Sequence, residues 1–295
     1  METVPVLKGS AGLNNKVDPV RLRYDGETGV QELAVAKNVD IGDSGRVSRR
    51  KGYSKVLSLS DCHSIYNAGT YCLFVHAGAL AVLEKDYSYT NIRNVTVGAK
   101  VSYVQVQDKI YYCNGYENGY VSKRISYSWV GEPYVGPTTT KVFSDPPVGH
   151  LVELFAGRIY ISVDNILWYT EPFAYSWVDL AKNFIPFQEK LRMVKAVKDG
   201  LWVSDTEGTY FLGGTSPKEM SFVKVANYPV IEGTDHKAFD ISDDQVVVWT
   251  STEGICVGAT GGKFTNLTRQ KLWYPDSNVG AGFVINGKYL SILQS

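Results

Sequence analysis

The most concentrated charge in this 295-residue sequence is a basic cluster formed by Arg46, Arg49, Arg50 and Lys51. Guanidinium and ammonium groups donate charge-assisted hydrogen bonds, and phosphate or carboxylate oxygens accept them. The cluster belongs to the segment 38–53, in which a polar Gly-Asp-Ser-Gly turn follows a short apolar stretch and predicts a hairpin. We therefore expect these four residues to contact phosphate or an acidic partner surface, with a solvated hairpin as the equal alternative.

Two neighbouring carboxylates, Asp243 and Asp244, are the only acidic pair that invites comparison with a catalytic site, because glycosidases work with two carboxylates. Both lie at an expected hairpin turn, where aspartate is common for backbone reasons, so turn formation is the favoured interpretation. The sequence contains no G-x-S-x-G elbow, no phosphate loop ending in G-K-S/T and no H-E-x-x-H motif. It predicts a protein that is not an enzyme, and a hydrolase is the least favoured alternative.

Metal and disulfide chemistry have little support in the sequence. The candidate ligands are His63, His76, His150, His236, Cys62, Cys72, Cys113 and Cys256. The histidines are far apart, so a shared metal would require distant segments to converge. The cysteines have no C-x-x-C spacing, and the last three lie in apolar runs typical of buried strands. We therefore predict neither a metal nor a cofactor.

Aromatic side chains are frequent, with 20 tyrosines, 11 phenylalanines and six tryptophans. Exposed rings can stack on sugars or peptides, and Trp168 and Trp273 would be the residues to test for such binding. Most of the rings alternate with other residues in strand-like runs, Trp202 and Trp249 among them. Large rings that fill the space between packed sheets are the favoured interpretation.

A repeat runs along the chain and indicates the fold. In each unit an apolar strand passes through a tight polar turn into a second apolar strand, and the clearest copies are 151–161, 193–203, 238–248 and 279–290. Their turns, at Gly157, Gly200, Asp244 and Gly287, follow one another at intervals of 43, 44 and 43 residues. A period of about 40–45 residues is typical of one β-propeller blade. Two weaker copies, at 71–83 and 101–113, bring the number of units to six.

A second recurrence supplies the next turn of the unit. Thr-Glu-Gly begins at Thr206 and again at Thr252, and the glycine allows a tight turn between the second and third strands. Each unit is then a four-stranded meander, which must stack with its neighbours to bury its apolar face. The sequence predicts an all-β fold, a single β-propeller of about six four-stranded blades over 56–295.

Two segments fall outside this pattern. Residues 1–55 are expected to form an N-terminal arm with a hairpin, part of which can complete the first or last blade. A Pro- and Gly-rich stretch around Gly136 and Gly149 predicts an inserted loop between the second and third units.

Charge and hydropathy exclude some classes of function. The 30 basic and 30 acidic residues cancel, so no global field draws the protein to nucleic acid or to an anionic membrane. No stretch approaches the ~20 apolar residues of a membrane span, and the first residues lack the pattern of a secretory signal. We therefore expect a protein without a membrane-spanning segment that is assembled in a cytoplasm.

Several motifs together resemble the tail nozzle and head-to-tail connector propeller proteins of short-tailed bacteriophages. They comprise Gly-Leu-Asn-Asn at 12–15, the segments 36–41 and 45–53, the segments 101–106 and 111–115, the segments 166–173 and 179–184, and 208–215. The likeness spans most of the chain, although the sequence is shorter than the larger nozzle proteins.

The resemblance implies a virion structural protein of the tail that continues the DNA-ejection channel below the portal and adaptor. It also implies a homo-oligomer, a hexameric ring, that contacts the adaptor or portal on one side and tail fibre or spike proteins on the other, with genomic DNA passing through. Ring symmetry suits the head-to-tail interfaces that such a tube requires. A carbohydrate- or peptide-binding propeller is the alternative function.

Overall fold

The computed structural model describes residues 9–42, 44–52, 54–136, 138–239, 244–273 and 276–294. This part of the chain is almost entirely β-structure, as the sequence predicts. Its helical content is two short 3-10 helices, η1 (Pro19–Arg21) and η2 (Thr260–Gly262).

Five sheets of the described chain have four antiparallel strands each, and in every one the strands follow sequence order. The first two are β6 (His63–Asn67), β7 (Cys72–His76), β8 (Ala79–Leu83) and β9 (Tyr89–Asn94), then β10 (Ser102–Val106), β11 (Lys109–Cys113), β12 (Asn118–Ser122) and β13 (Ile125–Ser128). The third is β14 (Leu151–Phe155), β15 (Arg158–Val163), β16 (Ile166–Tyr169) and β17 (Phe184–Pro186). The fourth is β18 (Met193–Val197), β19 (Gly200–Ser204), β20 (Thr209–Gly213) and β21 (Ser221–Ala226), and the fifth is β22 (His236–Ala238), β23 (Val246–Ser251), β24 (Gly254–Gly258) and β25 (Phe264–Asn266).

The repeat turns lie where the sequence predicts them. Each of the turns at Gly157, Gly200, Asp244 and Gly287 joins, or lies at the end of, the first two strands of its unit. The two Thr-Glu-Gly turns join the second and third strands, β19 to β20 and β23 to β24. The predicted four-stranded meander is therefore confirmed for five sheets of the described residues, whereas the unit at Gly287 has two strands there and six four-stranded blades are not confirmed.

One copy of the repeat is assigned to the wrong strands by the sequence. The segment 71–83 forms β7 and β8, the second and third strands of the first sheet, whereas every other copy forms the first and second. The true first strand, β6, reads His-Ser-Ile-Tyr-Asn and has no fully buried residue. Because its apolar content is low, the more apolar β7–β8 pair matched the pattern instead.

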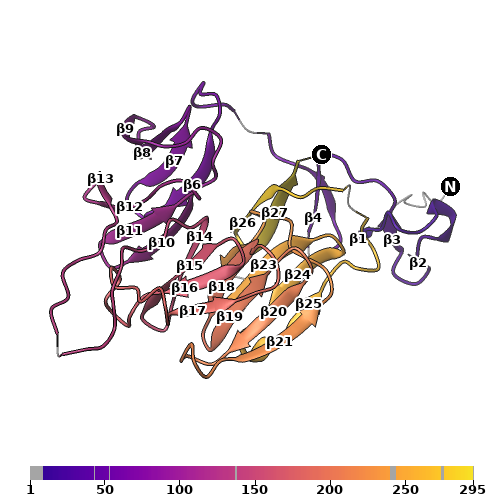
Figure 1. Cartoon of the computed structure of the whole chain (residues 1–295). Coiled ribbons are helices and arrows are strands. Elements are labelled where there is room, and N and C mark those ends of the chain that lie inside the picture. Colours follow the sequence, from indigo (N-terminus) through magenta and orange to yellow (C-terminus); the bar gives the residue numbers. More distant parts are fainter. Residues whose placement is uncertain are drawn as a thin grey trace, which may run out of the picture.

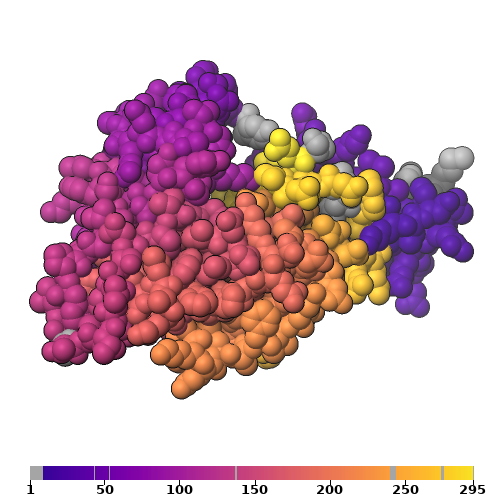
Figure 2. All heavy atoms as spheres, in the orientation of Figure 1, coloured from indigo at the N-terminus to yellow at the C-terminus, as the bar shows by residue number. Residues whose placement is uncertain are grey.

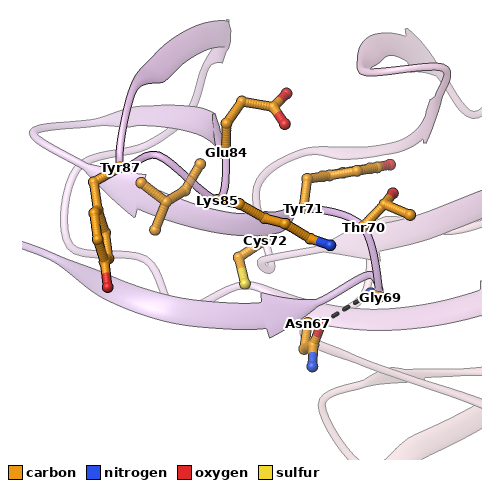
Figure 3. A pocket seen from close by; sticks show the side chains of 9 residues that line it. Asn67, Gly69, Thr70, Tyr71, Cys72, Glu84, Lys85 and Tyr87 are labelled. Atoms are coloured by element: carbon orange, nitrogen blue, oxygen red, sulfur yellow. Dashed lines mark hydrogen bonds between the residues drawn. The ribbon is translucent and has the colours of Figure 1, made fainter.

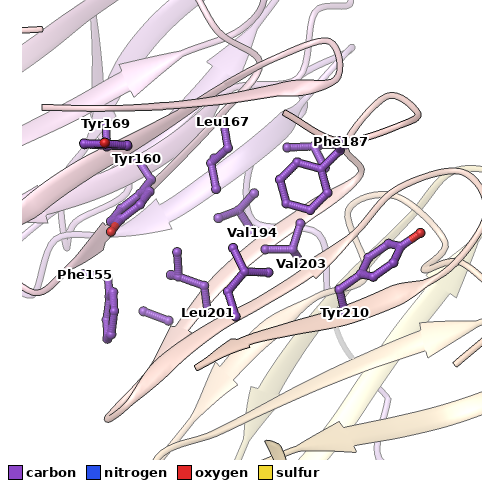
Figure 4. Packing of buried hydrophobic residues seen from close by; sticks show 12 residues of the cluster. Phe155, Tyr160, Leu167, Tyr169, Phe187, Val194, Leu201, Val203 and Tyr210 are labelled. Carbon is purple, nitrogen blue, oxygen red and sulfur yellow. The ribbon is translucent and has the colours of Figure 1, made fainter. Parts of the chain in front are cut away.

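The sheets are arranged in an arc, with the first strands on its inner side and the fourth strands on its outer side (Figure 1). Apolar residues from facing sheets fill the spaces between them, as in a sandwich. Figure 4 shows one such layer, where Tyr160 and Leu167 of the third sheet meet Val194 and Leu201 of the fourth. Equivalent clusters join the first and second, second and third, and fourth and fifth sheets.

The sixth unit has two strands in the described chain, β26 (Gly280–Ile285) and β27 (Lys288–Leu293). One face of this hairpin packs on the fifth sheet through Val284 and Tyr289. The opposite face carries Phe283 and Ile292, which are 42% and 68% exposed. No strand of the first sheet pairs with this hairpin in the described residues, so the arc of sheets is not closed (Figure 1). Lys100, which follows the first sheet, donates to the Gly280 carbonyl of β26 at 2.8 Å.

The N-terminal arm forms two small sheets of its own. The strands β1 (Gly9–Leu13), β3 (Val30–Leu33) and β2 (Tyr24–Asp25) make one sheet, and β4 (Val39–Ile41) and β5 (Val47–Arg49) make the expected hairpin. The arm lies beside the C-terminal strands at one end of the molecule (Figure 2). Asn15 fixes it there, because its backbone N–H donates to the Lys271 carbonyl at 2.9 Å and its side chain bonds the backbone of Trp273.

The predicted insertion lies between the second and third sheets. Apart from an isolated bridge between Ser144 and Val178, its described residues from 129 to 150 contain no strand. Tyr134 and Phe143 of this loop pack on Trp177 of the third sheet's long connection, with ring centroids 4.8 Å and 5.6 Å from the indole, the first ring tilted and the second stacked. The loop is thus attached to the body by aromatic contacts.

Candidate functional site

Three of the four predicted contact residues gather around one hollow. Arg49, Arg50 and Lys51, together with Asn38 and Gly52, line a cavity of about 460 Å³ where the strands of the β4–β5 hairpin separate. All of these side chains are exposed. Arg46 is exposed as well, but it lies at the turn end of the hairpin and does not line the hollow. The structure therefore brings Arg49, Arg50 and Lys51 together and separates Arg46 from them.

A second charged group, which sequence reasoning missed, lies on the inner strands of the arc. Lys237 on β22 forms an ion pair with Glu153 on β14, reaching past the intervening strand β18. On β18 itself, Lys195 binds Asp235 with 3.0 Å between Nζ and Oδ2. The carboxylates are almost fully buried, with side chains 4% and 7% exposed, whereas the side chains of Lys195 and Lys237 are 21% and 27% exposed. This axial cluster ties three sheets together at their centre.

The axial charges balance one another. Burial lowers the pKa of Lys195, but the carboxylates of Asp235 and Glu153 outweigh it and leave that pKa above its usual value. Lys195 is therefore charged at neutral pH. Burial raises the pKa of the nearby Tyr66, and the charge of Glu153 adds to the effect. Lys195 and Lys237 thus face Asp235 and Glu153, and the charge of Asp235 also acts on the nearby Lys100, so the carboxylates here are occupied by the protein's own cations.

The sequence did carry a signal for this cluster. Glu153 and Lys195 are the third residues of Leu-Val-Glu-Leu-Phe and Met-Val-Lys-Ala-Val, and Lys237 is central in His-Lys-Ala. A charged residue at the middle of the first strand thus recurs in three successive units. Because the first strands gather on the inner side of the arc, this recurrence marks a shared location.

The other predicted candidates do not come together. His150 bonds the Leu191 carbonyl and His76 bonds the Ser60 carbonyl, both at 2.7 Å. No three His, Cys, Asp or Glu side chains among the described residues are placed to hold a metal ion. Asp244 is exposed at its turn, and Asp243 lies outside the described residues. Cys113 and Cys256 are buried free thiols in β11 and β24.

The aromatic residues divide into two groups. Trp202 and Trp249 are completely buried between the fourth and fifth sheets, as the packing interpretation predicts. Trp168 lies in β16, the third strand of its sheet, and packs on Phe184 with 5.3 Å between ring centroids. Trp273 is 63% exposed and follows the fifth sheet. The two tryptophans proposed for ligand stacking therefore lie far from the inner strands and on different units.

A smaller hollow of about 190 Å³ lies at one end of the first sheet, with the Lys85 side chain across it (Figure 3). At its rim Arg124 donates to both carboxylate oxygens of Glu84, at 2.6 Å and 3.2 Å, and lies over the ring of Tyr71. Arg124 and Glu84 at this rim thus neutralise each other within the protein. The remaining lining side chains are a mixture of small polar and apolar groups without a convergent set of donors or acceptors.

The arm is held to the body by a buried carboxylate. Glu32, 3% exposed, accepts hydrogen bonds from the Asn14 amide at 2.8 Å and pairs with Lys271 at 3.2 Å. The hydrogen bond from Asn14 lowers the pKa of Glu32 below its usual value of 4.5, and Lys271 assists, while burial opposes them. Because Asn14 belongs to the arm and Lys271 to the body, the ionised carboxylate stabilises both the arm and its docking above pH 4.5, and this stability is lost as the pH falls through the lowered folded-state pKa.

We expect acid to loosen the arm before the sheets. Lowering the pH from 6 to 3 should reduce the exchange protection of the Asn15 amide about tenfold, because a hydrogen-bonded charge is being neutralised. Hydrogen exchange with mass spectrometry measures this, with the Thr170 amide of the third sheet as the internal reference. In Glu32→Gln the arm should be loose at both pH values, and an unchanged acid response in that variant would contradict the assignment to Glu32.

No helix in the described ranges is both long and apolar enough to cross a membrane. No protein-family model matches the chain, and no curated protein sequence does.

Solved structures do resemble the fold. Selenomethionine-substituted virginiamycin B lyase from Staphylococcus aureus superposes with a TM-score of 0.50 at 12% identity, over 81% of this chain and 87% of the lyase. A catalytically inactive form of that lyase gives 0.48 at 14% identity over 76% and 75% of the two chains. PorZ of Porphyromonas gingivalis gives 0.47 at 14% identity, over 88% of this chain and 35% of PorZ. At these identities the likeness concerns the fold alone, and the match with a TM-score of 0.50 supports a β-propeller.

Proposed function

We propose that this chain is a non-enzymatic structural protein of a bacteriophage virion, a ring component of the tail that continues the DNA-ejection channel below the portal and adaptor. The sequence resemblance to tail nozzle and connector propellers supplies the identity of the assembly. In the proposed ring the sheets act as a rigid body, and the segments outside them make contacts with neighbouring copies, the adaptor and the fibre or spike proteins.

One observation carries the proposal beyond the resemblance. The chain has an arm outside its blades, β1 to β5, and a sixth unit that has two strands in the described residues and exposes Phe283 and Ile292 on the face turned away from the fifth sheet. In a head-to-tail ring each copy contacts its two neighbours through two different surfaces. The arm and the uncovered apolar face of β26–β27 are two surfaces of different kinds, although both lie toward the same end of the molecule (Figure 1).

The proposal includes a complete sixth blade. Strands β26 and β27 supply two of its four strands, and the β4–β5 hairpin is a two-stranded unit that can supply the others, from the same chain or from its neighbour. Pairing at β27 would cover an exposed edge, which proteins rarely leave open. The outward amides of β27 should then exchange hydrogen more slowly in the assembled ring than in the isolated chain.

Two measurements test the function: the molar mass of the purified protein in solution, and the copy number of the protein in intact phage particles by mass spectrometry. We expect a hexamer-sized species and a fixed copy number in the virion. A protein that stays monomeric at high concentration and is absent from particles would overturn the proposal and leave only the fold.

A further inference from the structure

The β4–β5 hairpin places its cations around one opening of the surface. Arg49 is the last residue of β5, and the Arg50 N–H donates to the Asn38 carbonyl at 2.9 Å, so the two strands stay paired up to the rim of the hollow. Lys51 and Gly52 complete the rim. The cations of three consecutive residues therefore surround one cavity.

The charge at this rim is largely uncompensated. Arg50 pairs with Asp40 at 3.3 Å, and both side chains are more than a third exposed. Within the described residues, neither Arg49 nor Lys51 has a carboxylate within ion-pair distance. In the axial cluster, in contrast, Lys195 and Lys237 each pair with a carboxylate. Arg49 and Lys51 of the hairpin are thus basic groups that lie together without an ion pair in the described residues.

The size and lining of the hollow suit a phosphate-bearing strand. A volume of about 460 Å³ lies in the range of ligand sites and exceeds what one inorganic ion would fill. Arginine binds phosphate oxygens through two parallel N–H groups, and lysine adds a mobile point charge. The Asn38 side chain at the same rim adds an uncharged donor and acceptor.

We propose that this hollow binds the phosphate groups of a nucleic-acid backbone. Duplex DNA carries one charge per ~1.7 Å of its axis, so several closely spaced cations can each meet a phosphate. A folded acidic protein offers carboxylates at irregular spacing and fits less well. Apart from Arg50, which pairs with Asp40, no side chain of this rim is fixed by a charged partner among the described residues, and all of the lining side chains are exposed, so we expect contact with the backbone that is independent of base sequence. This inference does not depend on the assembly proposed above.

The test is fluorescence anisotropy of a labelled 30-base-pair duplex with the full-length protein across a range of salt concentrations. The slope of log K against log salt is about −0.9 for each phosphate contact. Replacing Arg49 and Lys51 together by alanine should flatten the slope by about 1.8 and weaken binding at least tenfold in low salt. Unrelated duplex sequences should bind equally well.

Arg46→Ala is the matched control, since Arg46 is exposed on the same hairpin but lies outside the hollow. It should change the slope by less than half as much as the double variant. The proposal is overturned if Arg46→Ala weakens binding as strongly, if the double variant binds like the unmodified protein, or if polyglutamate competes as well as DNA. The last result would identify a site for an acidic protein instead.

Discussion

Replacing Trp202 by alanine should cost about 3–5 kcal/mol of the free energy of unfolding, the range seen when a large buried ring is removed. Trp202 is completely buried on β19 and packs against Trp249, Phe211 and Phe264, with ring centroids 5.7, 5.0 and 6.2 Å away. Its indole N–H also donates to the Ala259 carbonyl at 3.2 Å. The substitution leaves a cavity between two sheets and a carbonyl without its donor.

The backbone around Trp202 is adapted to the ring and cannot collapse into the cavity. Gly258 on β24 lies so close that a Cβ atom there would be 2.5 Å from the indole. The surrounding strands β19, β23 and β24 are each held by ladders on both sides. Because a site that relaxes little keeps the full cavity, we expect a value in the upper half of the range.

Guanidinium denaturation monitored by circular dichroism measures the effect, with the midpoint expected to fall while the slope stays constant. Trp273→Ala is the matched control, because this ring is 63% exposed and its backbone, not its side chain, bonds Asn15. That variant should remain within about 0.5 kcal/mol of the unmodified protein. Equal losses in both variants would show that Trp202 does not join the two sheets.

The contrast between these two tryptophans shows what the sequence could and could not provide. Both occur in short apolar stretches, but Trp202 follows Asp199 and Gly200 in the regular repeat, whereas Trp273 comes after the last strand of the fifth unit. The repeat period and the turn residues together predict which strand of its unit a side chain belongs to. Outside the repeat, as at Trp273, the sequence offers no such rule, because the burial of a side chain depends on which distant segments pack against it.

The same reasoning explains the two charged sites. The basic residues at 46–51 are adjacent in sequence, so their clustering could be predicted, and only the position of Arg46 required the structure. Glu153 and Lys237 are 84 residues apart, and each appears in its own strand as one charge in an apolar run. Such a residue normally faces solvent at a sheet surface. Only the curvature of the arc, which depends on all the inter-sheet packing together, turns these positions toward a common centre.

We expect Glu153→Gln to destabilise the protein by about 2–3 kcal/mol. Removing one partner of a buried ion pair leaves the other charge without compensation, which typically costs about 3–5 kcal/mol. The Lys237 side chain is 27% exposed, so partial hydration of its ammonium group places the value at the lower end or below. Glutamine keeps the shape of glutamate and can still accept the Leu154 N–H at the oxygen that now does so at 2.9 Å. The expected loss of stability therefore measures the effect of removing the charge and not of changing the side-chain volume.

A double-mutant cycle separates this pair from the rest of the axial cluster. Lys237→Met alone should also be destabilising, because Glu153 is 4% exposed and would lose its cation. With both changes present no buried charge is left unpaired, so the double variant should recover most of the loss and give a coupling energy above about 1 kcal/mol. Additive losses would mean that Glu153 acts mainly through Lys195, whose charge it also stabilises. In that case the Lys237–Glu153 pair would add little to the attachment of the fifth sheet, which would depend on the Lys195–Asp235 pair and on the packing around Trp202.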